Sequence, residues 1–139
     1  MLRSVAATGM LLALLSACAA SSARPKSVVA LPNGYYLQPN AKLQTQIVKR
    51  QGGNVVPGPI AAYAVSGQVV AGALGEPPPE SRGYTNDLPF KGNADTRYFV
   101  LDTTSGKLDS NLDSAGWQQR LGALGVPQNL RIYAPLRWQ

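Results

Sequence analysis

The sequence predicts an α+β fold in which one C-terminal α-helix packs on a small antiparallel β-sheet or meander of about five strands. Three observations support this prediction. The 139 residues include 14 glycines and 11 prolines, which favour short strands and turns over long helices. Several short runs are apolar, or alternate between apolar and polar residues, as β-strands do. One segment near the C-terminus instead spaces its apolar residues as an amphipathic helix does.

The first strands are expected in the segment before residue 51. Residues 35–38 have the composition of a short strand. Residues 43–50 alternate for most of their length, which places Leu43, Thr45 and Ile47 on one face. This period of two indicates a second strand with one buried face.

The clearest hairpin joins residues 60–65 to residues 68–74, with Gly67 in the loop available for a positive φ. In the expected register Val65 faces Gln68. One face of the hairpin is mostly alanine, so a helix can lie close against it. Its members are Ala62, Ala64, Val69 and Ala71.

A long segment without a clean period, Gly75 to Asp95, follows the hairpin. It contains three consecutive prolines and then Tyr84, Leu88 and Phe90. Loops of this length are uncommon in compact domains and often functional. We therefore consider two interpretations: a partner-binding loop with these three side chains as apolar contacts, or a variable surface insertion, which we favour.

The last third of the chain contains the segments whose secondary structure the sequence predicts most clearly. Residues 97–102 are apolar on both faces and predict a central strand. Residues 113–124 predict a helix, because Asp113 suits an N-cap and Trp117, Leu121 and Leu124 recur at helical spacing. Residues 130–133 are expected to form the final strand.

The N-terminus has the parts of an export signal. Arg3 precedes an apolar run that is shorter than the roughly 20 residues a membrane-spanning helix needs. The run closes on Leu15, Ser16, Ala17 and Cys18. This pattern resembles the lipobox of bacterial lipoproteins, and Cys18 is the only cysteine in the sequence.

The resemblance implies that Cys18 carries a diacylglyceryl thioether and, as the mature N-terminus, a further acyl chain such as palmitate. Ala19 is not the aspartate that retains such proteins at the inner membrane of enteric bacteria, so we expect the outer membrane, facing the periplasm. The alternative is a periplasmic or secreted protein. The expected organisation is a signal peptide at 1–17, a lipidated N-terminus and flexible tether at 18–31, and one β-rich domain at 32–139.

The mature domain offers a second, smaller resemblance. Residues 98–103, together with Gly106, Leu112, Trp117, Leu121 and Gly125, resemble the C-terminal part of small exported Gram-negative proteins of unknown function. The resemblance covers about a fifth of the chain. It implies the same strand, turn and helix, and it transfers no functional residue.

The amino-acid composition excludes several kinds of catalysis and metal binding. The sequence has no histidine, which removes imidazole catalysis and imidazole metal ligands. A lipidated Cys18 leaves no free thiol. The acidic residues Asp102, Asp109 and Asp113 lie close in sequence, but residues 102–106 depart from a calcium loop, so structural roles are the better interpretation. We expect no catalytic residue, metal or cofactor.

The distribution of charged residues does not indicate a nucleic-acid-binding surface. The residues after Cys18 carry 12 basic and seven acidic side chains, and the basic ones are scattered. The sequence therefore predicts a lipid-anchored binding or envelope-assembly component whose partners are membrane lipid and an envelope protein. A purely structural envelope protein is the alternative, and an enzyme without histidine or cysteine chemistry is the least favoured.

Overall fold

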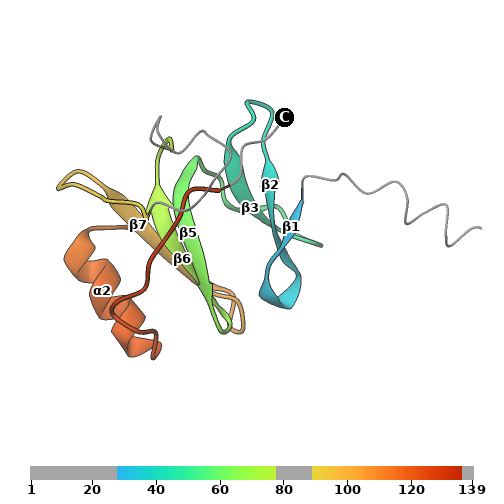
Figure 1. The fold of residues 1–139 in the computed structure, drawn as a ribbon. Coiled ribbons are helices and arrows are strands. Elements are labelled where there is room, and N and C mark those ends of the chain that lie inside the picture. Colours follow the sequence, from blue (N-terminus) through green and yellow to red (C-terminus); the bar gives the residue numbers. More distant parts are fainter. Residues whose placement is uncertain (1–27, 78–88, 136–139) are drawn as a thin grey trace, which may run out of the picture.

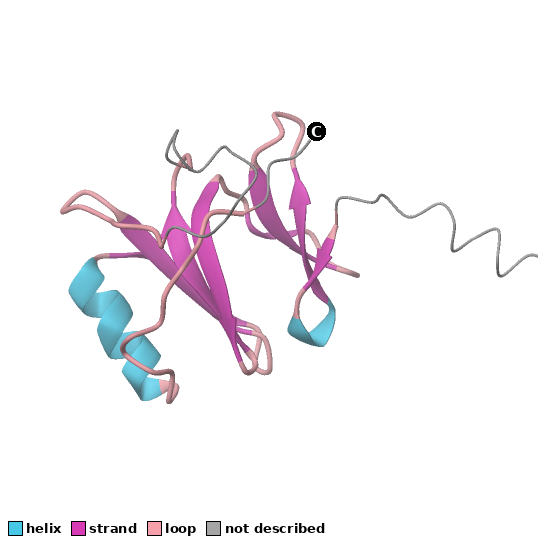
Figure 2. Cartoon of the chain, viewed as in Figure 1, coloured by secondary structure: helices cyan, strands magenta, loops and turns pink. Residues whose placement is uncertain are grey.

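The computed structural model describes residues 28–77 and 89–135, which form two antiparallel sheets and one α-helix (Figures 1 and 2). Sheet A has the order β1-β2-β3-β4, and sheet B the order β5-β6-β7-β8. The strands of sheet A are β1 (Val29–Ala30), β2 (Tyr35–Pro39), β3 (Thr45–Lys49) and β4 (Asn54–Val56). Those of sheet B are β5 (Ile60–Ser66), β6 (Val69–Leu74), β7 (Arg97–Asp102) and β8 (Lys107–Leu112). The helices are the 3-10 turn η1 (Pro32–Gly34) and α2 (Ser114–Ala123).

The α+β class is confirmed, but the expectation of one sheet of about five strands was wrong. Each meander has four strands, and the chain changes sheet between β4 and β5. The connection contains Pro57, Gly58 and Pro59, and Gly58 has φ +78°. A β-carbon on Gly58 would collide with the Thr45 carbonyl oxygen, so this crossing requires glycine.

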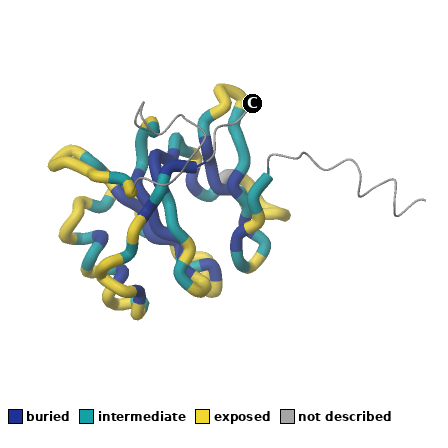
Figure 3. Tube along the Cα trace, viewed as in Figure 1, coloured by how far each residue is buried: buried dark blue, intermediate teal, exposed yellow. Residues whose placement is uncertain are grey.

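Sheet B is the central layer of the fold, with sheet A on one face and α2 on the other (Figure 1). Leu37 and Ile47 of sheet A pack with residues of sheet B in one buried cluster: Val70, Phe99 and Leu101. Alternate residues of the same strands face the helix. Strand β7 is therefore buried on both faces, as its apolar sequence predicts (Figure 3).

The hairpin β5–β6 forms, with a register two residues away from the expected one. Val65 pairs with Val70, and Gly67 and Gln68 make the turn, because Gly67 takes φ +58°. A shift of two residues preserves the faces of both strands. The alanine face therefore still lies against the helix, as predicted, and its members pack with Trp117 and Leu121.

Helix α2 is the element that the sequence predicted most accurately. Asp113 is its N-cap and accepts a hydrogen bond from the Gly116 amide at 2.7 Å. Trp117 is buried on sheet B, where its ring stacks on Tyr98 with centroids 4.6 Å apart. Its indole Nε1 donates to the carbonyl oxygen of Phe99 at 3.1 Å. The tryptophan thus joins the helix to β7 by both packing and a hydrogen bond.

Two expected strand boundaries were wrong. Strand β3 begins at Thr45, and Leu43 lies outside it with φ +60°. Residues 130–133 form no strand, and Tyr133 makes only isolated bridges, to Tyr63 and Pro89. Pro135 has no N–H to donate, which limits further pairing of this segment.

The fold also begins earlier than the expected boundary at residue 32. Val29 pairs with Leu37, and Ala30 with Tyr36. Leu31 is buried in the cluster between the sheets, and its amide donates to the Tyr35 carbonyl at 2.8 Å. Apolar burial therefore recruits the end of the expected tether into sheet A. Residues 18–27 lie outside the described residues.

Candidate functional site

The first candidate from the sequence, the acidic cluster, divides into separate structural roles. Asp102 ends β7 and accepts hydrogen bonds from the Thr104 amide and the Ser105 hydroxyl, both at 3.0 Å. The Thr104 hydrogen bond is the main reason that the pKa of Asp102 is lowered, and the Ser105 hydroxyl adds to it. This carboxylate therefore organises the β7–β8 turn.

The other two carboxylates hold the helix. Asp109 of β8 forms an ion pair with Arg120 of α2 at 2.6 Å, and Asp113 caps the same helix. The part of the chain that the structure describes contains no group of three or more residues able to hold a metal ion. Asp102 thus closes a turn and Asp113 caps the helix, which are the structural roles expected for these two residues.

We expect Asp102 to contribute stability that is lost in acid. The folded state lowers its pKa below the ordinary 3.8, so in acid the folded chain binds fewer protons than the unfolded chain. The free energy of unfolding therefore rises with pH through this range, and the contribution is present above about pH 4. Urea unfolding of the wild type and Asp102→Asn should give a stability difference that disappears as the pH falls through the lowered pKa. A difference that is constant with pH would contradict this role.

The second candidate, the partner-binding loop, is described only at its C-terminal end. Tyr84 and Leu88 lie outside the described residues, as does Cys18. Phe90 is half-buried and packs against the cluster between sheet B and α2. Its amide donates to the Ile132 carbonyl at 2.8 Å. Phe90 therefore fixes the end of this segment to the fold, and its role in partner binding stays a prediction.

A feature that sequence reasoning missed lies between β2 and β3. In the Leu43 loop (residues 40–44), Leu43 is 57% exposed, the largest exposure among the apolar side chains that the structure identifies as exposed. Its φ of +60° is a left-handed conformation that bulky residues rarely adopt. The loop thus presents a leucine to solvent on a strained backbone.

Asn40 holds the Leu43 loop in this conformation. Its side-chain oxygen accepts from the amides of Lys42 and Gln44, at 2.8 and 3.0 Å. Its carbonyl accepts from the Leu43 amide at 3.0 Å, and its own amide donates to the Gln44 carbonyl at 2.8 Å. These hydrogen bonds offset the energetic cost of the left-handed backbone conformation at Leu43.

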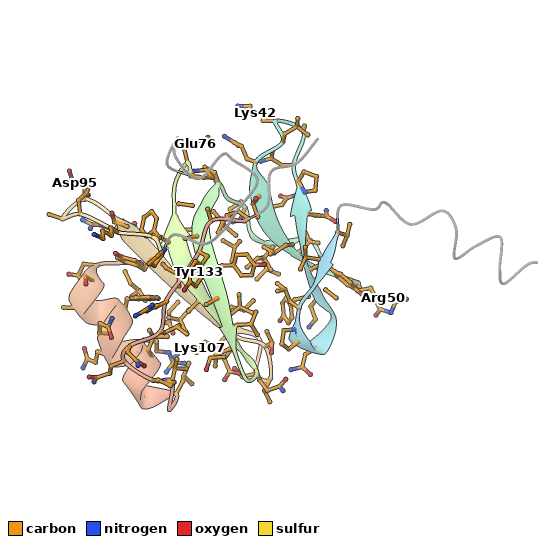
Figure 4. The ribbon with its side chains drawn as sticks, viewed as in Figure 1. Lys42, Arg50, Glu76, Asp95, Lys107 and Tyr133 are labelled. Atoms are coloured by element: carbon orange, nitrogen blue, oxygen red, sulfur yellow. The ribbon has the colours of Figure 1, made fainter. Side chains whose placement is uncertain are left out.

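The loop lies at a defined end of the molecule (Figure 4). Gln44 donates its side-chain amide to the carboxylate of Glu76, which follows β6. Lys42 is exposed beside Leu43, and Figure 4 shows Lys42 and Glu76 at the same end of the fold. The described residues at this end therefore include one basic and one acidic side chain beside the exposed leucine.

Comparisons with protein-family models, curated proteins and solved structures gave no match to this chain. Within residues 28–77 and 89–135, no helix has the length and apolar character needed to cross a membrane.

Proposed function

We propose that this protein is a lipid-anchored protein of the bacterial cell envelope that acts as a non-catalytic binding or assembly component. The single observation that carries the proposal is the run of Leu15, Ser16, Ala17 and Cys18 at the end of an apolar segment. In this proposal Cys18 carries the lipid, and the domain faces the periplasm from the outer membrane.

The anchor explains how a small domain can act through weak contacts. Nine residues separate Cys18 from Val28, where the described fold starts. An extended chain of that length reaches at most about 30 Å, so the domain stays close to the bilayer. Confinement of this kind raises the effective concentration of a partner in the same membrane, so that weak contacts suffice. An envelope protein is the expected partner.

We expect Cys18→Ala to abolish metabolic labelling with palmitate and to release the protein from the membrane fraction or block its processing. The physical reason is that two or more acyl chains hold a protein stably, at about 0.8 kcal/mol per buried methylene, and the variant has none. Labelling and membrane fractionation of the wild type and the variant are the measurements. Ser16→Ala, which keeps a small residue two positions before the cysteine, is the matched control and should label normally. A wild-type protein recovered unlabelled and soluble would contradict the proposal.

Crosslinking in cells separates a binding role from a purely structural one. Photoreactive residues at positions 84 and 88 test the long loop. Because Phe90 packs on the core, exposed Lys91 is the better third position. Arg50, in the β3–β4 turn, serves as the control. A discrete partner captured from the loop alone supports binding. The absence of any adduct, with an unaltered phenotype after loop deletion, would leave only the structural role.

A further inference from the structure

We infer that the Leu43 loop is a second membrane contact, in which Leu43 enters the interface of the bilayer that holds the lipid anchor. This inference rests on the proposed function. The occupant is a lipid surface, and the contact orients the domain relative to the membrane.

The exposure of Leu43 is built into the loop. A glycine or asparagine would occupy a left-handed backbone position with less strain than leucine does. Leu43 nevertheless stands there, 57% exposed, and the hydrogen bonds of Asn40 hold the loop around it. Strained positions of this kind often mark functional sites. The neighbouring Ala41 and Lys42 are also exposed, so residues 41–43 form a solvent-exposed tip of the loop.

The position of the loop relative to the anchored end of the chain points to the membrane. Strand β1 is antiparallel to β2, with Val29 opposite Leu37. Since β2 runs on from Leu37 to Pro39 and into the Leu43 loop, the chain enters sheet A from the end where this loop lies. Figure 1 shows the β2–β3 connection at one end of the fold and the β5–β6 turn at the other. The Leu43 loop is thus at the end of sheet A where Val28, the first described residue, leads into β1.

The opposite end provides an internal control. Asn33 of η1 donates to the Gln68 side chain at 2.8 Å, which places the β5–β6 turn beside the start of β2. Val65 lies just before that turn and is 44% exposed, the second of the exposed large apolar side chains. An apolar residue of similar exposure is therefore available at the end that should face away from the bilayer.

The expected contact is apolar. The described residues at this end include one basic and one acidic side chain, Lys42 and Glu76, so we expect the contact to depend little on the fraction of anionic lipid. Lys42 suits the headgroup region, because a lysine can extend its amine to water while its stem lies on lipid. One leucine binds a bilayer weakly by itself. The anchor makes such a contact effective, since it confines the loop to the membrane surface.

The test uses the full-length protein, purified from membranes and reconstituted into vesicles of phosphatidylethanolamine and phosphatidylglycerol. An environment-sensitive fluorophore is attached by maleimide chemistry to Ala41→Cys, or to Val65→Cys as the control. A lipidated Cys18 is a thioether and does not react. We expect a blue shift, with quenching by a lipid-borne quencher, at position 41 and neither at position 65. Vesicles of phosphatidylcholine alone should give the same result at position 41.

A second variant separates the leucine side chain from the integrity of the loop. Leu43→Asn suits the left-handed backbone, so the melting temperature should not fall. The blue shift at position 41 should nevertheless be lost. A probe at 41 that behaves like the probe at 65, or that is unaffected by Leu43→Asn, overturns the inference. A blue shift in native envelopes but not in protein-free vesicles assigns the loop to a protein partner and also overturns it.

The experiment distinguishes failure of this inference from failure of the proposed function. Wild-type protein, with no added cysteine, should not react with the maleimide fluorophore. A labelled wild type shows a free thiol at Cys18 and rejects the lipid anchor itself. A wild type that carries palmitate and is not labelled by maleimide, combined with no shift at position 41, rejects only the membrane contact of the Leu43 loop.

Discussion

Replacing Trp117 by alanine is expected to lower the free energy of unfolding by about 3–5 kcal/mol, as is typical for a large buried aromatic side chain. The variant removes the stacking on Tyr98 and leaves a cavity between α2 and sheet B. It also leaves the Phe99 carbonyl without the indole hydrogen bond. Chemical denaturation followed by circular dichroism measures the loss.

Two variants show whether the loss of stability in Trp117→Ala comes from the contact of the tryptophan with sheet B. Gln119→Ala changes an exposed residue of the same helix and should leave the free energy of unfolding within about 0.5 kcal/mol of the wild type. Trp117→Phe keeps an aromatic ring against Tyr98 but removes the indole N–H, so its effect should be intermediate. A Trp117→Ala protein as stable as the wild type would show that α2 does not depend on this anchor.

The elements that sequence reasoning predicted well are those in which local and tertiary preferences agree. Residues 97–102 are apolar on both faces, and the fold buries both faces. The helix has its cap, its apolar spacing and its glycine terminator within a few residues: Asp113, Trp117, Leu121 and Gly125. The alanine face of the hairpin predicted the place of the helix, because small side chains allow close approach. Each of these signals lies within one short stretch of the sequence.

The number of sheets was not predictable in the same way. The alternating patterns identify strands but not their partners, and the separation of sheet A from sheet B depends on the crossing at Gly58. The start of the fold at Val29, before the expected residue 32, was unpredictable for the same reason. Val29 and Ala30 gain their place only by pairing with β2, and so short a strand has no period of its own.

Leu43 shows how a correct pattern gave a wrong position for one residue. The alternation of residues 43–50 places Leu43 on the buried face, but the hydrogen bonds of Asn40 take precedence over the period. A signal was present in the sequence: asparagine directly after a proline favours a turn closed by its own side chain. Giving Pro39 and Asn40 that weight would have started the strand later, at Thr45, and left Leu43 in the loop.

Gly72→Ala is expected to destabilise the protein by about 3 kcal/mol or more, at the upper end of overpacking effects, because it places a methyl group inside the pairing of β5 with β6. Gly72 is buried on the central strand β6, opposite Tyr63 and Phe99. A β-carbon there would collide with the Ala62 carbonyl oxygen and lie 2.9 Å from the Tyr63 Cα and 3.0 Å from Phe99 Cε1. Since the first two neighbours are backbone atoms, the strands must separate to relieve the collision. Urea unfolding measures the loss.

The control for Gly72→Ala is the same substitution in the helix. Gly122 lies on the exposed side of α2, and a β-carbon there would meet no atom within 4 Å. Because alanine favours a helix over glycine by up to about 1 kcal/mol, Gly122→Ala should stabilise the protein. The two substitutions add the same methyl group and should have opposite signs, since one position has a backbone neighbour and the other has open space. If Gly72→Ala were tolerated as well as Gly122→Ala, β5 and β6 could not lie as close together as this fold requires.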